Sequence, residues 1–188
     1  MRHSYWQEHD LPTSLEIAQE GICIGEEEAG GDEEILSWVK RLCYDIASFS
    51  WIGWDEAGIS PTGEQSRLGL EMARRNLKYA IELNKGNLPT SRAYWMVGAH
   101  LLTSGEASRA IDEFEESETY AQLAGAIGEA ELAKGFTILA RLTSGQESEV
   151  AILVAHLDHM MLNEDAAQFV GQIQTAARIV GIIGLETP

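Results

Sequence analysis

Basic residues are scarce in this chain of 188 residues. It has 13 lysines and arginines against 30 aspartates and glutamates, which gives a formal net charge of -17 and an isoelectric point near 4.5. Phosphate groups would be repelled from such a protein at long range. This argues against nucleic acid and against anionic membrane surfaces as partners. Solubility alone is the simplest explanation of the excess acid.

Cysteines and long apolar runs are also scarce. The two cysteines, Cys23 and Cys43, match no zinc-site spacing, so we expect free thiols in a reducing compartment. No stretch approaches the ~20 apolar residues that span a bilayer, and the first ten residues lack the apolar run of a signal peptide. The sequence therefore predicts a cytoplasmic protein with no membrane partner.

Catalytic and cofactor motifs are missing as well. The chain contains no glycine-rich phosphate loop, no GxSxG nucleophile elbow and no HExxH zinc motif. His156 and His159 are three residues apart, but no clustered third ligand is evident. We predict no metal and no cofactor, and nothing in the sequence indicates an enzyme.

Helix signals dominate what is present, and strand signals are weak. Three capping boxes, which begin at Thr13, Thr62 and Ser144, predict helix starts. The first helix is expected to end near Gln19 and to be followed by an acidic loop over residues 25–31. Further helices are expected at about 32–49, 63–84, 90–103, 106–121 and 126–142, then after Ser144 and after a cap at Asn163. Short connections make about eight helices into antiparallel hairpins, so the fold class is all-α.

A break at Gly58, Pro61 and Gly63 suggests a domain boundary. Residues 1–60 carry 13 acidic and 3 basic residues, whereas residues 61–145 carry 11 and 9. We therefore predict an acidic N-terminal helical lobe over residues 1–60 and a helical domain over residues 61–188. The nearly balanced middle segment is where a basic contact surface is expected.

A short internal repeat supports the helical hairpins. The sequence Leu-Thr-Ser-Gly at residues 102–105 recurs at residues 142–145, and both copies fall at an expected turn between helices. The offset of 40 residues lies within the range of repeat architectures.

Residues 91–124 resemble a tetratricopeptide repeat (TPR). The residues that carry the pattern are Tyr94, Val97, Gly98 and Leu101 on one helix, and Ala110, Phe114 and Ser117 on the next. Glu118 stands where the family usually has leucine, and Gln122 where it usually has proline. The resemblance implies an α–α superhelix in which Gly98 permits close helix packing and Phe114 fills the space toward the neighbouring unit.

The resemblance also implies a peptide-binding surface on the first helix of the unit. By position this surface is Arg92, Trp95, Ala99 and Leu102, and we expect a protein or peptide partner to bind there. Versions of the family that clamp a terminal carboxylate carry lysine and asparagine at these positions, so Trp95 and Ala99 favour an apolar or aromatic contact instead. Core packing of Trp95 is the alternative.

A basic stripe on the helix 63–85 is expected to flank this surface. Arg74 and Lys78 belong to it, together with Arg67 and Lys85. The alternative is a solvated face on which Glu71 and Glu82 pair with these cations.

The leading functional hypothesis is a protein–protein interaction module with an open groove and a partly exposed Trp95. The alternative is a small-molecule-binding or catalytic domain with an aromatic-lined pocket near Trp51 and Trp54, using His156 and His159. The last helix is apolar on more than one face, which predicts a homo-oligomer through the C-terminal helix. It could instead fold back on the helix over residues 150–161.

Overall fold

The computed structural model describes residues 1–146 and 149–182, and this part of the chain contains helices and no strands. The all-α prediction is confirmed. The helices form two compact units: the first consists of residues 1–52 and 56–86, and the second of residues 53–55 and those from Asn87 onward. Among the described helices, none combines the length and the apolar character needed to cross a bilayer.

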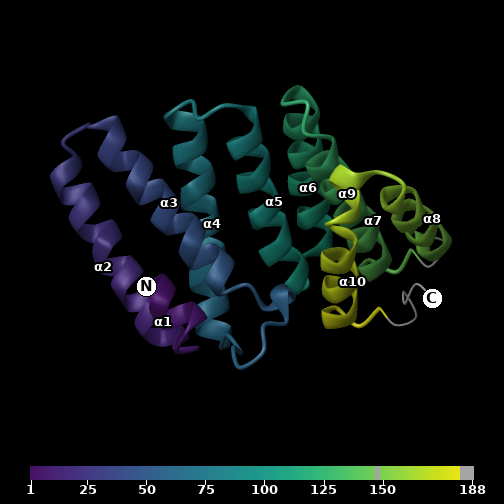
Figure 1. The fold of residues 1–188 in the computed structure, drawn as a ribbon, viewed down its shortest axis with the longest axis horizontal. Helices are drawn as coiled ribbons and strands as arrows, with labels where there is room; N and C mark the ends of the chain where they lie inside the picture. Colours follow the sequence, from purple (N-terminus) through teal and green to yellow (C-terminus); the bar gives the residue numbers. More distant parts are fainter. Residues whose placement is uncertain (147–148, 183–188) are drawn as a thin grey trace. The chain divides into compact units, whose positions relative to one another are not determined.

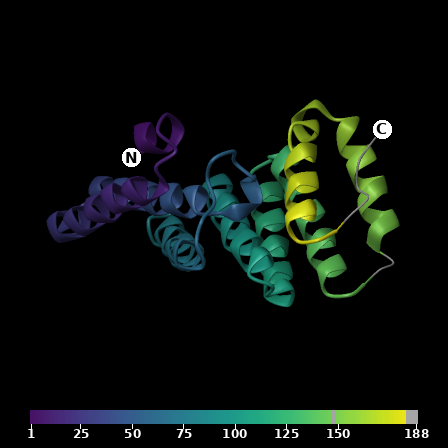
Figure 2. The ribbon, with the colours of Figure 1, turned by 90° about the horizontal axis from the view of Figure 1, so that it is seen from below.

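The first unit is a row of three long helices with a short one beside it (Figure 1). The long helices are α2 (Leu11–Ala29), α3 (Glu33–Phe49) and α4 (Gly63–Glu82), and α3 packs against both others. Helix α1 (Arg2–Trp6) lies to one side of the α2–α3 hairpin (Figure 2). The Tyr5 ring stacks on Phe49 with a centroid distance of 3.9 Å, which fixes α1 to the end of α3.

Helix α2 differs from its prediction at both ends. Asp10 is its cap, with a side-chain oxygen 3.0 Å from the backbone nitrogen of Thr13, so the capping box predicted to begin at Thr13 is wrong. The loop predicted over residues 25–31 is also wrong, because α2 continues to Ala29 and ends at the left-handed Gly30. Gly25 lies within the helix. Its lack of a side chain lets α3 pack closely against α2 there, because a Cβ atom on Gly25 would lie 2.6 Å from the side chain of Val39.

The helix starts expected near residues 32 and 63 are confirmed. Asp32 accepts hydrogen bonds from the first backbone N–H groups of α3, and Thr62 forms a complete capping box with Gln65 at the start of α4. Helix α4 packs with the N-terminal helices, and the side-chain amide of Asn76 donates to the Lys40 carbonyl at 2.8 Å. Residues 58–63 lie inside the first unit, and the second unit resumes at Asn87. Whether residues 1–60 form a domain of their own stays a prediction.

The second unit is built around one central helix. It contains α5 (Asn87–Thr103), α6 (Ala107–Leu123), α7 (Ile127–Thr143), α8 (Glu149–Met161), α9 (Glu164–Ala167) and α10 (Val170–Ile179). All five other helices pack against α7. The 3-10 helix η1 (Ile52–Trp54) lies between α3 and α4 in the sequence, and its last two residues belong to the second unit. Helix α5 begins three residues before residue 90, its expected start, and Thr90 itself is buried.

Helices α5, α6 and α7 end in the same way. Each has 17 residues and is followed by a glycine with positive φ, at positions 105, 125 and 145. The N–H of Gly105 donates to the Leu102 carbonyl at 3.1 Å, and Gly145 donates to Leu142 at 3.0 Å. The recurring tetrapeptide thus marks two equivalent helix ends. Gly125 is a third one, between the helices expected at about 106–121 and 126–142, although the tetrapeptide does not recur there.

The C-terminal region departs from the prediction of one last helix. Asn163 caps a helix as expected, with its side-chain oxygen 2.9 Å from the backbone nitrogen of Asp165. That helix, α9, ends after one turn, and α10 follows it. Helix α10 folds back mainly on α7 and buries Ile173 and Ala177 there. The predicted capping box from Ser144 to Glu147 falls partly outside the described residues.

A glycine-to-alanine change tests these helix ends. Gly125→Ala is expected to lower the free energy of unfolding by about 1–2 kcal/mol, because φ is 68° there and a Cβ atom disfavours that conformation. Gly171→Ala is the matched control: Gly171 lies in α10 with open space around its Cβ position, so alanine is expected to be neutral or stabilising. Urea denaturation of both variants measures the difference, and equal stabilities would contradict this role of Gly125.

Candidate functional site

The surface predicted from the TPR resemblance lies on α5 and is mostly buried. Trp95 is 5% exposed, and Ala99 and Leu102 are buried as well. The expectation of an open groove with a partly exposed Trp95 is therefore wrong, and core packing describes Trp95 in this conformation. Only Arg92 of the four residues is accessible. Whether any of them contacts a partner stays a prediction.

The burial of Trp95 has a clear physical cause. Its ring packs edge-on against Phe136 of α7, with centroids 5.1 Å apart, and against Trp54 at 6.0 Å. Asp55, which follows Trp54 in the sequence, forms an ion pair with Arg178 of α10 at 2.7 Å. The short segment over residues 53–55 thus occupies the side of α5 where a peptide was expected.

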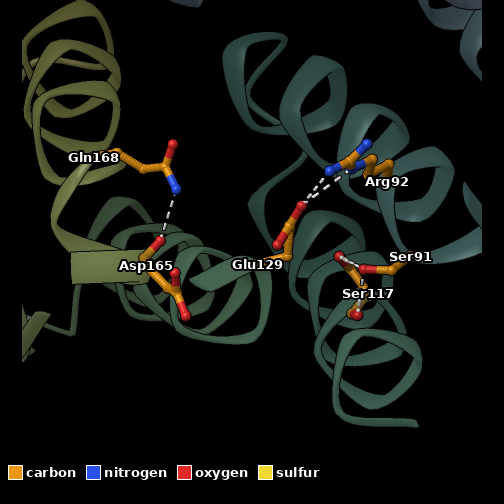
Figure 3. Close-up of polar contacts among 6 residues, drawn as sticks. All are labelled: Ser91, Arg92, Ser117, Glu129, Asp165 and Gln168. Carbon is orange, nitrogen blue, oxygen red and sulfur yellow. Dashed lines mark hydrogen bonds and ion pairs between the residues drawn. The ribbon is translucent and has the colours of Figure 1, made fainter. Parts of the chain in front are cut away.

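Arg92 is already paired within the chain (Figure 3). Its guanidinium donates to the carboxylate of Glu129 at the start of α7, with the Nε atom 3.2 Å from Oε1. In the same region, the Ser91 hydroxyl donates to the Ser117 carbonyl at 2.8 Å and joins α5 to α6. An exposed ion pair of this kind contributes only about 0.2–1 kcal/mol, so a partner's carboxylate could displace Glu129 at low cost.

Arg74 and Lys78 do not extend this surface within one unit. Both are exposed on α4 of the first unit, whereas Arg92 belongs to the second. Lys78 lies 3.8 Å from Glu82 of the same helix, which is the pairing expected for a solvated face. The six predicted partner-binding residues therefore do not form one site within either unit.

The aromatic residues and histidines of the alternative hypothesis do not form one site either. Trp51 is buried in the first unit, and Trp54 packs in the second. His156 is buried against α7, while His159 is exposed. Among the described residues, no three His, Cys, Asp or Glu side chains are grouped so that they could hold a metal ion.

A cleft between α6 and α8 is the best candidate for a functional site in the second unit. Its volume is about 300 Å³, and we call it the α6–α8 cleft. Thr137 and Ile138 of α7 are both buried and form its floor. The complete lining is Glu115 and Glu118 from α6, Lys134, Thr137, Ile138 and Arg141 from α7, and Glu149 and Ile152 from α8.

Charges of both signs line this cleft. Arg141 binds Glu115 with an N–O distance of 3.1 Å, whereas Lys134 forms no ion pair with any described residue. Burial raises the pKa of the Glu118 carboxyl above its ordinary value, and the nearby charge of Lys134 opposes this shift. Glu118 accepts a hydrogen bond from the Gln122 amide at 2.9 Å. The cleft therefore holds a partly desolvated carboxylate that is not in direct contact with a cation.

Helix α8 exposes apolar side chains on two flanks, of which one borders the cleft. Leu153 and Leu157 are buried and hold α8 on α7. Val150, Ile152 and Val154 are exposed, and Ile152, which is 49% exposed, also lines the cleft. Because a helix turns by about 100° per residue, Val150 and Val154 lie on one flank of α8, and Ile152 lies on the opposite flank, toward the cleft.

His156 anchors α8 beside the cleft. Its Nε2 atom lies 2.9 Å from the Glu131 carbonyl oxygen, which can only accept, so Nε2 carries the proton. The Nδ1 atom lies 3.6 Å from the Glu131 carboxylate. The ring packs on Gly135, where a Cβ atom would lie 3.3 Å from the imidazole and 2.4 Å from Ile173.

His156 is expected to make the second unit less stable in mild acid. Burial lowers its pKa below the ordinary value of about 6.5, with Glu131, Lys134 and His159 as the charged neighbours. Its contribution is thus fully present above about pH 6.5 and is lost as the pH falls through the lowered pKa. Denaturation between about pH 5 and 8 should show a steeper loss in the wild type than in His156→Gln. Parallel curves would contradict this assignment.

A second cavity lies in the first unit, and the residues that line it are less suited to a binding site. It lies between α2 and α4 and has a volume of about 520 Å³. Three of its lining residues are the carboxylates Glu16, Glu64 and Glu71, with Arg67 as the cation. No aromatic residue lines either cavity, so neither fits the aromatic pocket of the alternative hypothesis.

Sequence reasoning noticed two parts of the α6–α8 cleft without joining them. Glu118 stood out as a departure from the TPR pattern, and the segment from Val150 to Ala155 stood out as almost entirely apolar. These segments are more than 30 residues apart in the sequence, and only the packing of α6 and α8 on α7 brings them together. Lys134 gave no signal of its own.

Comparison with known proteins gives no identity for the chain: no protein-family model, no curated protein sequence and no solved structure matches it.

Proposed function

We propose that this protein is a protein–protein interaction module built from helical hairpins, which binds a partner protein or peptide on its second unit. The observation that carries the proposal is the exposed apolar side chains of α8, with Ile152 beside the charge-lined α6–α8 cleft and Val150 and Val154 on the opposite flank of the helix. Exposed apolar side chains rimmed by charged residues are typical of interaction sites. Regular helices on a well-packed α7 form a rigid support for such a surface.

The repeated helix ends support a TPR-like architecture for this module. A Cβ atom on Gly98 would lie 2.7 Å from the Phe114 ring, which is the close approach that the TPR pattern implies. The repeated turns are 40 residues apart, however, and a TPR unit has about 34. The proposal is therefore a TPR-like interaction module with longer helices.

The proposal includes a cytoplasmic location and a partner other than nucleic acid, in keeping with the net charge of -17. Self-association through the last helix has weaker support, because Ile173, Ala176 and Ala177 of α10 are covered within the same chain. The apolar side chains that α8 exposes are more accessible.

Capture of native partners from source lysate tests the proposal. The baits are the wild type, the double variant Val150→Asp/Ile152→Asp, and the control Leu123→Asp, which changes an exposed apolar residue that does not line the cleft. We expect a partner on the wild type and the control but not on the double variant. Circular dichroism must first show that all three baits are folded.

Each other outcome has a defined meaning. A partner held equally by all three baits would support an interaction function but place its surface elsewhere. No specific partner on the wild-type bait would contradict the proposed function.

A further inference from the structure

We infer that the first unit carries a second interaction surface, which binds a basic amphipathic helix of another protein. This inference goes beyond the function proposed for the second unit. The surface is an apolar strip along the α2–α3 hairpin. Ile17 and Ile24 of α2 are 45% and 54% exposed, and Trp38 of α3 is 58% exposed. We call these three residues the α2–α3 strip.

The two isoleucines lie on the side of α2 that faces away from α4. Ile17 and Ile24 are seven residues apart, so they share one side of the helix about two turns apart. The opposite side carries Glu26, whose carboxylate accepts a hydrogen bond from Tyr79 of α4 at 2.5 Å. The isoleucines therefore lie outside the contact between α2 and α4.

Trp38 lies on the side of α3 that holds α1. Asp45, seven residues later, pairs with Arg2 of α1 at 3.0 Å, and Phe49 stacks on Tyr5 of α1. Because a helix turns by about 100° per residue, Trp38, Asp45 and Phe49 fall within about 40° of one another. Asp45 and Phe49 are buried at the seat of α1, whereas Trp38 stays exposed.

Helix α1 joins the two sides of this surface. It lies along one side of the α2–α3 hairpin (Figure 2), and the Ser14 hydroxyl of α2 donates to the Met1 carbonyl at 3.2 Å. A Cβ atom on Gly21, seven residues after Ser14, would lie 2.9 Å from Leu42 of α3, so the two helices touch directly beside the strip. The strip thus continues the seat of α1, where the hairpin already binds a helix.

The charges beside the strip favour a basic helix. Helix α2 carries five glutamates and no lysine, arginine or histidine. Glu20 and Glu28 are exposed three or four residues from the isoleucines, and neither forms an ion pair with a described residue. On α3, the Arg41 guanidinium lies 5.1 Å from the centre of the Trp38 ring, so a cation already packs on this aromatic side chain. Lysine or arginine beside the apolar positions of a partner helix would compensate the two glutamates.

A second copy of the chain fits the strip less well. Two copies in contact through α2 would bring the glutamates of one helix close to those of the other. Each copy also has a net charge of -17, which opposes association at long range. The same charge attracts a basic segment.

Two synthetic peptides with matched apolar faces test the inference. Each is a fluorescein-labelled helix of about 18 residues, with leucine and tryptophan at helical spacing. One carries lysines beside the apolar positions, and the other carries glutamates. Fluorescence anisotropy with the full chain measures both affinities at about 50 mM and about 300 mM salt.

The lysine peptide is expected to bind at least about tenfold more tightly than the glutamate peptide, and more weakly at the higher salt concentration. Ile24→Ala/Trp38→Ala leaves the charge unchanged and is expected to weaken binding by about tenfold or more. Glu20→Gln/Glu28→Gln is expected to weaken it by about three- to tenfold and to reduce its salt dependence.

Two controls locate the binding surface. Glu64→Gln/Glu71→Gln removes the same charge from α4 and should change the affinity little. Ile152→Asp changes an exposed residue of the second unit and should leave peptide binding intact. Circular dichroism of every variant checks that it is folded, which we expect because all these positions are exposed.

Four results would overturn the inference. Three are no binding of the lysine peptide, equal affinity for both peptides, and equal losses in the strip and α4 variants. The fourth is a dimer in sedimentation experiments that Ile24→Ala/Trp38→Ala dissociates, which would assign the strip to a second copy. These results are distinct from failure of the proposed function, because that function is tested by variants of Val150 and Ile152 in the second unit.

Discussion

Phe136→Ala is expected to lower the free energy of unfolding of the second unit by about 3–5 kcal/mol. Phe136 is fully buried at the centre of α7. Its ring contacts Trp95 of α5 with a centroid distance of 5.1 Å and Phe114 of α6 at 5.2 Å. Alanine would leave a cavity where three helices meet, and rigid neighbouring helices can close it only in part.

Hydrogen exchange of the α7 amides is the appropriate measurement, because it reports on the second unit alone. The control is Val154→Ala on the exposed face of α8, for which we expect a change within about 0.5 kcal/mol. A loss below about 1 kcal/mol for Phe136→Ala would show that α7 is not the centre of this core.

The second large effect is expected at Gly98, where a side chain has no room. A Cβ atom there would lie 2.7 Å from the Phe114 ring, and Phe114 is fully buried. Gly98→Leu is therefore expected to cost about 2–3 kcal/mol, even though leucine is a better helix former than glycine. Urea denaturation measures the loss.

A compensating change separates overpacking from other causes. Gly98→Leu/Phe114→Ala should be more stable than the sum of the two single losses predicts, because the smaller side chain makes room for the larger one. Gly63→Ala is the control, since its Cβ position faces open space. Strict additivity of the two changes would contradict a direct steric conflict between Gly98 and Phe114.

The fold class and most helix ends could be predicted from the sequence because their signals are local. The capping box at Thr62 and the turn at Gly105 depend on residues within one turn of the chain. Gly25 was misinterpreted for the converse reason. A glycine directly before three glutamates is typical of a loop, yet here it permits α2 to approach Val39 of α3.

The candidate site was less accessible to sequence reasoning because it depends on contacts between distant segments. The helical pattern places Trp95 on α5 but cannot show that Trp54 and Phe136 cover it. Likewise, the exposure of Ile152 depends on which side of α8 meets α7. The sequence shows which residues are of a type suited to a binding site, but it does not show which of them are buried.

Site-specific cross-linking tests the central claim most directly. A photoreactive phenylalanine derivative replaces Ile152 in one full-length protein and Leu123 in another, since both positions are exposed on the second unit. After irradiation in source lysate, mass spectrometry identifies the attached segment. We predict that position 152 cross-links to one segment of one partner protein and that position 123 does not. No cross-link at position 152, or the same products from both positions, would contradict the account.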